Sequence, residues 1–258
     1  MSLIRRNRDQ GALDASTMDF GDEDVGNHSQ RAPVVMVMDN SYSMRGKAIA
    51  ELNTALADMR DRLRDDPELS SKVEICLITF GHNGVTAWRG DAPAPPGKSP
   101  FVPASRFEVP RLQAGGVTPM AEALELGMRL IAEEKRELRE RKLSHYRPVM
   151  WCVTDGEPTD SSGSPSDDWK RLPAIIASEE RAKRFAFFTA SVGDISAYGD
   201  EVLRTLAPKS HFKLEGFDFS VVLQLVSASA ESAAHDDPID AIKARVQAMY
   251  KQIVVPQV

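Results

Sequence analysis

Two kinds of hydrophobic pattern alternate along this chain. The first is a short run of consecutive apolar residues, such as Val34–Met38, which is typical of a strand buried on both faces because a strand with a wet face would alternate. Such runs predict strands at 34–38, 72–80, 148–153 and 185–192, with shorter strands at 84–88 and 211–214. The second pattern spaces apolar residues by three and four positions, and it predicts helices at 45–64, 120–142, 169–176, 201–206, 219–226 and 239–253.

The order of these elements defines the expected fold class. Strands that alternate with helices at this spacing predict an α/β fold with a mostly parallel central sheet and helices on both faces. The segment 84–88 follows a glycine-containing turn and is expected to return as one short antiparallel edge strand. At the helix starts, Ser43 and Thr118 stand where N-cap residues are expected, and Pro119 fits the first helical position.

The two ends of the chain carry a weaker pattern than its centre. Residues 1–32 are polar and show no hydrophobic periodicity, which predicts a flexible N-terminal arm. Four acidic residues gather in this arm: Asp19, Asp22, Glu23 and Asp24. We expect the folded domain at residues 33–230, and a C-terminal helix within residues 231–258 that packs on the domain or extends it.

One internal segment, from Asp91 to Pro110, breaks the alternation. It contains prolines at positions 93, 95, 96, 100, 103 and 110, and because proline donates no backbone hydrogen bond, the segment predicts a loop instead of a helix or a central strand. Trp88, Phe101 and Phe107 flank this loop or lie in it. Packing of these rings on the core is the favoured interpretation, with exposure to a partner as the alternative.

Composition narrows the classes of function. The chain has 258 residues, of which 42% are hydrophobic and 27% are charged, as is ordinary for a soluble globular protein. Its net charge of -6 offers little attraction to nucleic acid or to an anionic membrane. No apolar run follows the early arginines and none has the length of a membrane span, so a cytoplasmic protein is expected. Cys76 and Cys152 lie inside apolar runs, and the histidines lack the spacing of zinc ligands.

The first buried strand ends in three oxygen-bearing side chains. Asp39, Ser41 and Ser43 stand two residues apart, so a loop leaving the strand can turn one carboxylate and two hydroxyls toward one point. Oxygen ligands of this kind suit a hard divalent cation. The same residue types also hydrogen-bond to their own turn, so the motif alone leaves both interpretations open.

Two further segments supply oxygen atoms at the same edge of the expected sheet. Thr118 follows two glycines at the start of a predicted helix, and Asp155 comes directly after the buried strand 148–153. Because the carboxyl ends of parallel strands meet at one edge of a sheet, both side chains are expected near those of Asp39, Ser41 and Ser43.

The three motifs occur in a fixed order along the chain. They read Asp-Asn-Ser-Tyr-Ser-Met from Asp39, Gly-Gly-Val-Thr-Pro-Met from Gly115 and Val-Thr-Asp-Gly-Glu-Pro-Thr-Asp from Val153. In this order they resemble the von Willebrand factor A domain with its metal-ion-dependent adhesion site, from roughly Pro33 to Ser229. The resemblance implies a Rossmann-like fold. Within that family, the Asp-Gly-Glu-Pro-Thr-Asp run is similar to that of cytoplasmic bacterial proteins of the TerY type, which are associated with tellurite resistance.

The resemblance also implies a role for each of the five residues. Ser41 and Ser43 would bind Mg2+ or Mn2+ directly, Thr118 directly or through water, and Asp39 and Asp155 largely through water. A cation held mostly by neutral hydroxyls keeps an exchangeable water, which a Glu or Asp of a partner protein replaces. The implied function is a metal-dependent protein–protein interaction module, an adaptor or scaffold and not an enzyme. The TerY type further implies a bacterial stress-response or defence system, with a protein kinase and a protein phosphatase as partners.

Three other interpretations remain open. A metal-dependent hydrolase or phosphotransferase of the haloacid-dehalogenase type would need a carboxylate at position 41, where this chain has Ser41, and the sequence lacks a Gly-x-Ser-x-Gly elbow and a phosphate-binding loop. An interaction module with an empty metal site would still bind its partner in the presence of a chelator. In the third, Asp22, Glu23 or Asp24 of the arm occupies the protein's own metal or that of a neighbour.

Overall fold

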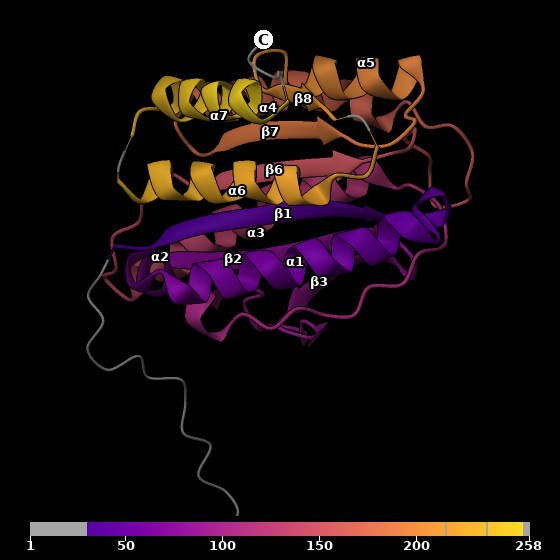
Figure 1. Cartoon of the computed structure of the whole chain (residues 1–258). Helices are drawn as coiled ribbons and strands as arrows, with labels where there is room; N and C mark the ends of the chain where they lie inside the picture. The colour runs from indigo at the N-terminus through magenta and orange to yellow at the C-terminus, as the bar shows by residue number, and fades with distance from the viewer. Residues whose placement is uncertain (1–29, 215, 236, 255–258) are drawn as a thin grey trace, which may run out of the picture.

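The computed structural model describes residues 30–214, 216–235 and 237–254, so almost all of the arm expected at 1–32 lies outside the described residues. The described chain forms one eight-stranded sheet with helices on both sides (Figure 1). The strands are β1 (Ala32–Asn40), β2 (Val73–Gly81), β3 (Gly84–Arg89), β4 (Ala92–Pro93), β5 (Val102–Pro103), β6 (Val149–Thr154), β7 (Ala186–Ser191) and β8 (His211–Lys213). The helices are α1 (Lys47–Asp65), α2 (Pro67–Lys72), α3 (Met120–Glu140), α4 (Leu172–Arg181), α5 (Ala197–Leu206), α6 (Phe219–Ala234) and α7 (Ile239–Val254), with 3-10 turns at Tyr42–Met44, Ala104–Arg106 and Asp168–Arg171. The predicted α/β class is confirmed.

The sheet places β1 at its centre. The strands follow the order β4-β3-β2-β1-β6-β7-β8, with β5 paired to β2 off this path. β1 pairs in parallel with β2 and β6, β6 with β7, and β7 with β8. The order of the strands reverses at β1, and the carboxyl ends of strands at such a point are where open α/β sheets bind their ligands.

Antiparallel pairing is confined to the strands beyond β2. β3 returns antiparallel to β2 with Gly84 opposite Gly81, as predicted for 84–88. The proline-rich segment, expected to be a loop, contributes the two-residue strands β4 and β5 and a 3-10 turn, and neither strand is central in the sheet. Pro93 and Pro103 are tolerated there because β4 and β5 each pair with only one neighbouring strand. The missing backbone N–H of proline is therefore not needed for pairing with a second strand. Phe101 and Phe107 are buried, which confirms that they pack on the core.

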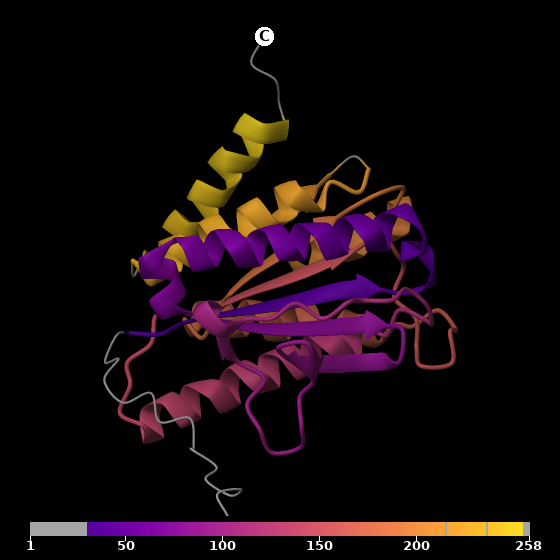
Figure 2. The same ribbon diagram turned by 60° about the horizontal axis from the view of Figure 1, so that its bottom comes forward.

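Side chains of β1 alternate between two hydrophobic cores. Val34, Met36 and Met38 lie in the core formed with α1, α6 and α7, whereas Val35 and Val37 lie in the core formed with α3, α4 and α5. Figure 2 shows α1, α6 and α7 above the sheet and α3 below it. Because both faces are covered, the central strands consist of continuous apolar runs and not of alternating ones.

The first strand begins slightly before the expected domain boundary at residue 33. β1 starts at Ala32, and Arg31 is buried with its backbone N–H bonded to Ser144 O at 3.0 Å. The helix α2 was not predicted, although its signal is present: Asp66 accepts hydrogen bonds at the N-cap and Pro67 occupies the first helical position.

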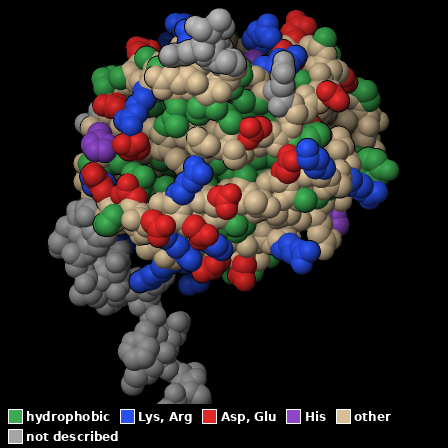
Figure 3. Space-filling view, viewed as in Figure 1, with side chains coloured by type: hydrophobic (Ala, Val, Ile, Leu, Met, Phe, Trp, Pro, Cys, Tyr) green, Lys and Arg blue, Asp and Glu red, His purple; other side chains and the backbone are tan. Residues whose placement is uncertain are grey.

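The surface over α1, α6 and α7 combines charged and apolar areas. Figure 3 shows acidic and basic side chains interspersed over α1 and α2, and hydrophobic side chains gathered between α6 and α7. Where the structure is described, no helix combines the length and the apolar character needed to cross a membrane.

Candidate metal centre

The side chains of the first motif gather where β1 ends. The Asp39 Oδ1 atom accepts a hydrogen bond from Ser41 N at 2.7 Å. This bond closes a short turn through which the chain leaves the sheet. The Ser41 and Ser43 hydroxyl oxygens lie 3.0 Å apart. Ser43 Oγ in turn donates to Asp155 Oδ1 at 2.7 Å, which joins the end of β1 to the end of β6. Four of the five predicted residues are therefore linked by hydrogen bonds.

The fifth predicted residue, Thr118, lies at the same point. A Cβ built on Gly156 would lie 3.5 Å from Thr118 Oγ1, 3.6 Å from Asp39 Oδ2 and 3.7 Å from Ser43 Oγ. Oxygen atoms from three separate segments thus surround one small volume next to Gly156. Only a glycine at position 156 leaves that volume empty of side-chain carbon.

Two predicted helix caps are wrong, and the correction matters for the site. The helix after β1 starts at Lys47 with Gly46 at its N-cap, while Ser43 lies in the preceding 3-10 turn. The helix α3 starts at Met120 with Pro119 at its N-cap, so Thr118 stands one residue outside it. Neither hydroxyl is used to cap its helix, and both lie at the site instead.

Two glycines allow the site loops to approach each other. A Cβ on Gly81 would lie 2.3 Å from Ser41 N, and one on Gly116 would lie 2.3 Å from Gly81 O, distances at which the backbones would have to move. Both glycines also have a positive φ, of 143° and 73°. Asn40 O accepts hydrogen bonds from His82 N and Gly115 N at 3.2 and 2.9 Å, which fixes the three loops together.

One residue of the site was missed by the sequence analysis. The hydroxyl of Thr154, the last residue of β6, donates a hydrogen bond to Asp39 Oδ2 and accepts one from Gly156 N at 3.0 Å. It therefore orients Asp39 and positions Gly156 at once. Thr154 comes directly before the predicted ligand Asp155, and this position could have marked it as a candidate. The sequence alone, however, does not show that its side chain turns toward β1.

Burial dominates the electrostatics of the two carboxylates. Asp39 is 1% exposed, and this burial raises its pKa from the ordinary value of 3.8 to about 7, against hydrogen bonds from Ser41 and Thr154 that lower it. Burial also raises the pKa of Asp155, while the hydrogen bond from Ser43 lowers it. The nearby carboxylate of Asp155 raises the pKa of Asp39 further, so the state in which both carboxylates are charged is disfavoured.

The donor set fits a hard divalent cation. The groups that hydrogen-bond to Asp39 are neutral, whereas a cation beside it would favour the ionised carboxylate that burial disfavours. Across the described ranges, no three His, Cys, Asp or Glu side chains form a metal-binding group. A cation at this site would therefore take hydroxyl as well as carboxylate ligands, a set typical of Mg2+ or Mn2+ and not of zinc.

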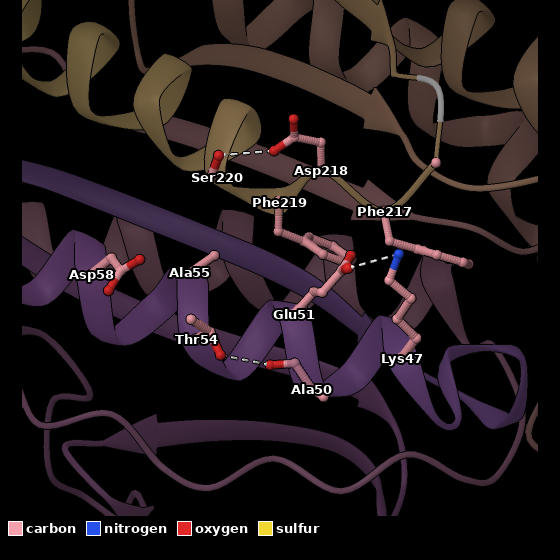
Figure 4. Close-up of a pocket in the computed structure, with 11 residues that line it drawn as sticks. Lys47, Ala50, Glu51, Thr54, Ala55, Asp58, Phe217, Asp218, Phe219 and Ser220 are labelled. Carbon is pink, nitrogen blue, oxygen red and sulfur yellow. Dashed lines mark hydrogen bonds and ion pairs between the residues drawn. The ribbon is translucent and has the colours of Figure 1, made fainter.

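The surroundings of the site offer surface for a larger ligand. Tyr42 lies between the two serines with 63% of its surface exposed, and the Arg45 guanidinium lies 4.1 Å from its ring centroid. A groove of about 570 Å³ lies between the first turns of α1 and the segment that enters α6 (Figure 4). Its charged lining consists of Glu51, Asp58, Asp218 and Lys47, and Lys47 is paired with Glu51 at 3.2 Å. The groove is therefore acidic.

A central parallel sheet covered by helices, with oxygen-bearing side chains at the carboxyl ends of β1 and β6, defines an open α/β domain of the ligand-binding class. A family model, the von Willebrand factor type A domain, matches residues 34–227. This chain belongs to the von Willebrand factor type A domain family, as its three motifs predicted. Members of this family are generally metal-dependent protein-interaction modules.

No curated protein sequence matches the chain significantly. Among solved structures, the chain is similar to proximal thread matrix protein 1 from the mussel byssus, with 16% identity and a TM-score of 0.46 over 85% of this chain and 47% of that one. It is similar to the pilus adhesin SpaC from Lactobacillus rhamnosus GG, with 14% identity and a TM-score of 0.49 over 87% of this chain and 30% of that one. A third is the manganese-loaded TRAP protein of Plasmodium vivax, with 13% identity and a TM-score of 0.45 over 75% of this chain and 72% of that one. The chain spans less than half the length of the first two.

Proposed function

We propose that this protein is an adaptor that binds an acidic residue of a partner protein through a Mg2+ or Mn2+ ion held by Asp39, Ser41, Ser43, Thr118 and Asp155. The observation that carries this proposal is the convergence of Asp39, Ser43 and Thr118 around Gly156, with Asp155 hydrogen-bonded to Ser43 at 2.7 Å. Family membership supports it, because von Willebrand factor type A domains are generally interaction modules of this kind.

The ligand types favour a receptor over a reaction centre. Three of the five side chains are neutral hydroxyls, so a bound cation would keep much of its positive charge and attract a carboxylate. The protein's own part is to hold these oxygens in place: Thr154 orients Asp39, and Gly156 leaves room above them. We therefore propose that the protein is not an enzyme.

The surface next to the site suggests what flanks the partner's acidic residue. Tyr42 offers an exposed ring, and the groove along the first turns of α1 carries the carboxylates Glu51, Asp58 and Asp218. A partner segment with an apolar or basic side chain near its acidic residue would match this surface. The resemblance to the TerY type extends the proposal to a cytoplasmic bacterial protein of a stress-response or defence system, with a protein kinase and a protein phosphatase as partners.

The test is capture of partners on the tagged protein in Mg2+ and in EDTA. Partners that bind wild type in Mg2+, and are lost both in EDTA and with Asp39→Asn, support the metal-bridged adaptor. Asp160→Asn serves as the matched control, because Asp160 lies in an exposed loop and accepts hydrogen bonds only locally. Partners retained in EDTA and in Asp39→Asn would make the metal site irrelevant to binding.

The same preparations test the enzymatic alternative. A metal-dependent hydrolase or phosphotransferase would turn over a generic phosphoester such as p-nitrophenyl phosphate, and Asp39→Asn would abolish that turnover. We expect no turnover above the buffer rate with Mg2+ or Mn2+. Turnover that depends on Asp39 would show that the protein is an enzyme and would overturn the proposed adaptor function.

A further inference from the structure

A second polar cavity lies at the opposite end of the sheet from the candidate metal centre. It has a volume of about 240 Å³ and lies next to the residues that start β1 and β2. We call it the basal pocket, and its lining consists of Arg31, Ser70, Ser71, Glu74, Arg89, Lys98, Ser99, Phe101, Pro103, Ser105, Arg106, Glu134, Glu137 and Arg141. Six of these residues belong to the proline-rich segment 91–110, and the proposed function does not use the pocket.

The wall of the basal pocket contains three buried charged side chains. Arg31, Glu74 and Glu134 are 2%, 5% and 4% exposed. Arg31 Nη1 donates to Ser71 O at 2.9 Å, and its Nε lies 3.7 Å from Glu74 Oε1. Ser99 Oγ donates to Glu134 Oε2 at 2.6 Å, which fastens the proline-rich segment to α3. These contacts hold the cavity in a defined shape.

The pocket as a whole is basic. Five of its lining residues are cationic, namely Arg31, Arg89, Lys98, Arg106 and Arg141, while three are acidic, namely Glu74, Glu134 and Glu137. Burial raises the pKa of the Glu134 carboxyl. Lys98, Arg106 and Arg141 are exposed and lie at the rim. The pocket therefore favours an anionic occupant that carries more than one charge.

The chain itself supplies such an occupant directly before the pocket. Asp19, Asp22, Glu23 and Asp24 precede Arg31 with no lysine or arginine among residues 19–30. Arg31 is at once the residue through which this segment enters the domain and part of the pocket wall. Asp24 lies seven positions before Arg31, and this length of chain spans at most about 25 Å. The acidic segment is thus tethered within reach of the rim.

We propose that the acidic segment Asp19–Asp24 docks in the basal pocket of its own chain, where its carboxylates pair with Lys98, Arg106 and Arg141. A tether this short gives the segment an effective concentration of about a millimolar or more, so weak surface ion pairs suffice to hold it. The proposal does not depend on the function proposed for the metal centre.

The basal pocket lies nearer to the arm than the metal centre does. Asp39 lies about 23 Å from Ala32 along β1. Asp24 is eight positions before Ala32, so it covers this distance only when its chain, at most about 29 Å long, is nearly extended. Docking in the basal pocket keeps these carboxylates away from the metal centre, where they would compete with a partner's acidic residue.

Disulfide trapping in the full chain tests the proposal. The variant Asp22→Cys/Lys98→Cys is oxidised mildly, and the yield of intramolecular cross-link is measured on non-reducing gels and by mass spectrometry. Cys76 and Cys152 are both fully buried and do not compete. One control, Asp22→Cys/Ser144→Cys, places the second thiol beside Arg31 but outside the pocket. The other, Asp22→Cys/Tyr42→Cys, places it beside the metal centre.

We expect the Lys98 pair to cross-link at least about fivefold more than either control, and to lose this advantage at high salt, which screens exposed charges. Adding Asp19→Asn/Glu23→Gln/Asp24→Asn should lower the yield, whereas Asp9→Asn/Asp14→Asn, which neutralises acidic residues farther from the pocket, should not. Equal yields for the Lys98 and Ser144 pairs would overturn the proposal. A preferred Tyr42 cross-link would place the arm at the metal centre instead, and a preferred dimer would place it in the pocket of a second copy.

Discussion

The pattern Asp-x-Ser-x-Ser occurs twice in this chain, at 39–43 and at 160–164. Both copies make the same turn: Asp39 Oδ1 accepts from Ser41 N at 2.7 Å, and Asp160 Oδ1 accepts from Ser162 N at 2.8 Å. The paired hydroxyl oxygens are 3.0 Å apart in the first copy and 3.2 Å apart in the second. These two distances therefore do not distinguish the copies.

Their surroundings do distinguish them. Asp160 is half-buried at the start of an exposed loop, and hydrogen bonds from the Ser162 hydroxyl and then from Ser164 N lower its pKa. Asp39 is buried at the end of the central strand, and burial raises its pKa to about 7. The first copy also has a second carboxylate, Asp155, across the sheet edge. A turn motif becomes a candidate cation site when the fold buries its carboxylate beside another one.

The largest expected difference between the two copies is the response to metal. At a Mn2+ concentration of a thousand times its Kd, the free energy of unfolding of wild type should rise by about 4 kcal/mol, because the ion binds only the folded state. Asp39→Asn should abolish this gain, and Asp160→Asn should leave it intact. Urea unfolding with and without Mn2+ measures both. A gain that survives in Asp39→Asn would show that the ion binds elsewhere.

This comparison also shows how far the sequence could predict the molecule. The buried strands were predictable because their apolar runs are continuous, a consequence of helices covering both faces of the sheet. The five candidate ligands were identifiable from three motifs in order, and the structure brings all five side chains together. That they bind a metal stays a prediction.

Features that depend on contacts between distant segments could not be predicted. The approach of Gly81 to Ser41 and of Gly116 to Gly81 excludes side chains at both glycines, but neither contact has a sequence signature. The hydrogen bond from Thr154 to Asp39 likewise follows from the parallel register of β1 and β6. The basal pocket was missed because its charged residues come from segments spread along the chain from Arg31 to Arg141, which only the fold brings together.

A smaller effect is the opposite response of the two aspartates to pH in metal-free protein. Asp39 has a pKa of about 7 in the folded state and an ordinary value of 3.8 when unfolded. Its contribution to stability is therefore fully present below about pH 4 and is lost as pH rises through about 7, by roughly 2.5 kcal/mol between pH 5 and 8. Asp160 has a lowered pKa, so its contribution is present above its unfolded value and is lost only in acid.

Urea unfolding of metal-free protein from pH 5 to 8 measures this effect against the two asparagine variants. Relative to wild type, Asp39→Asn should become more stable as pH rises, because it removes a buried charge. Asp160→Asn should follow wild type across this range. Saturating Mg2+ should remove the difference between pH 5 and 8 in wild type, since the cation favours the ionised carboxylate. A wild-type curve parallel to that of Asp39→Asn would show that Asp39 does not titrate in this range.

The smallest expected effect separates the hydroxyls of the two copies. Ser43 and Ser164 are both exposed, so Ser43→Ala and Ser164→Ala should each change the metal-free stability by less than about 0.5 kcal/mol. Only Ser43→Ala should weaken Mn2+ binding, by about tenfold or more, equivalent to about 1.4 kcal/mol. Titration calorimetry of the three proteins measures this directly. Because the two serines share their exposure and their sequence pattern, equal affinities would mean that Ser43 is not a ligand and that burial of Asp39 alone creates the site.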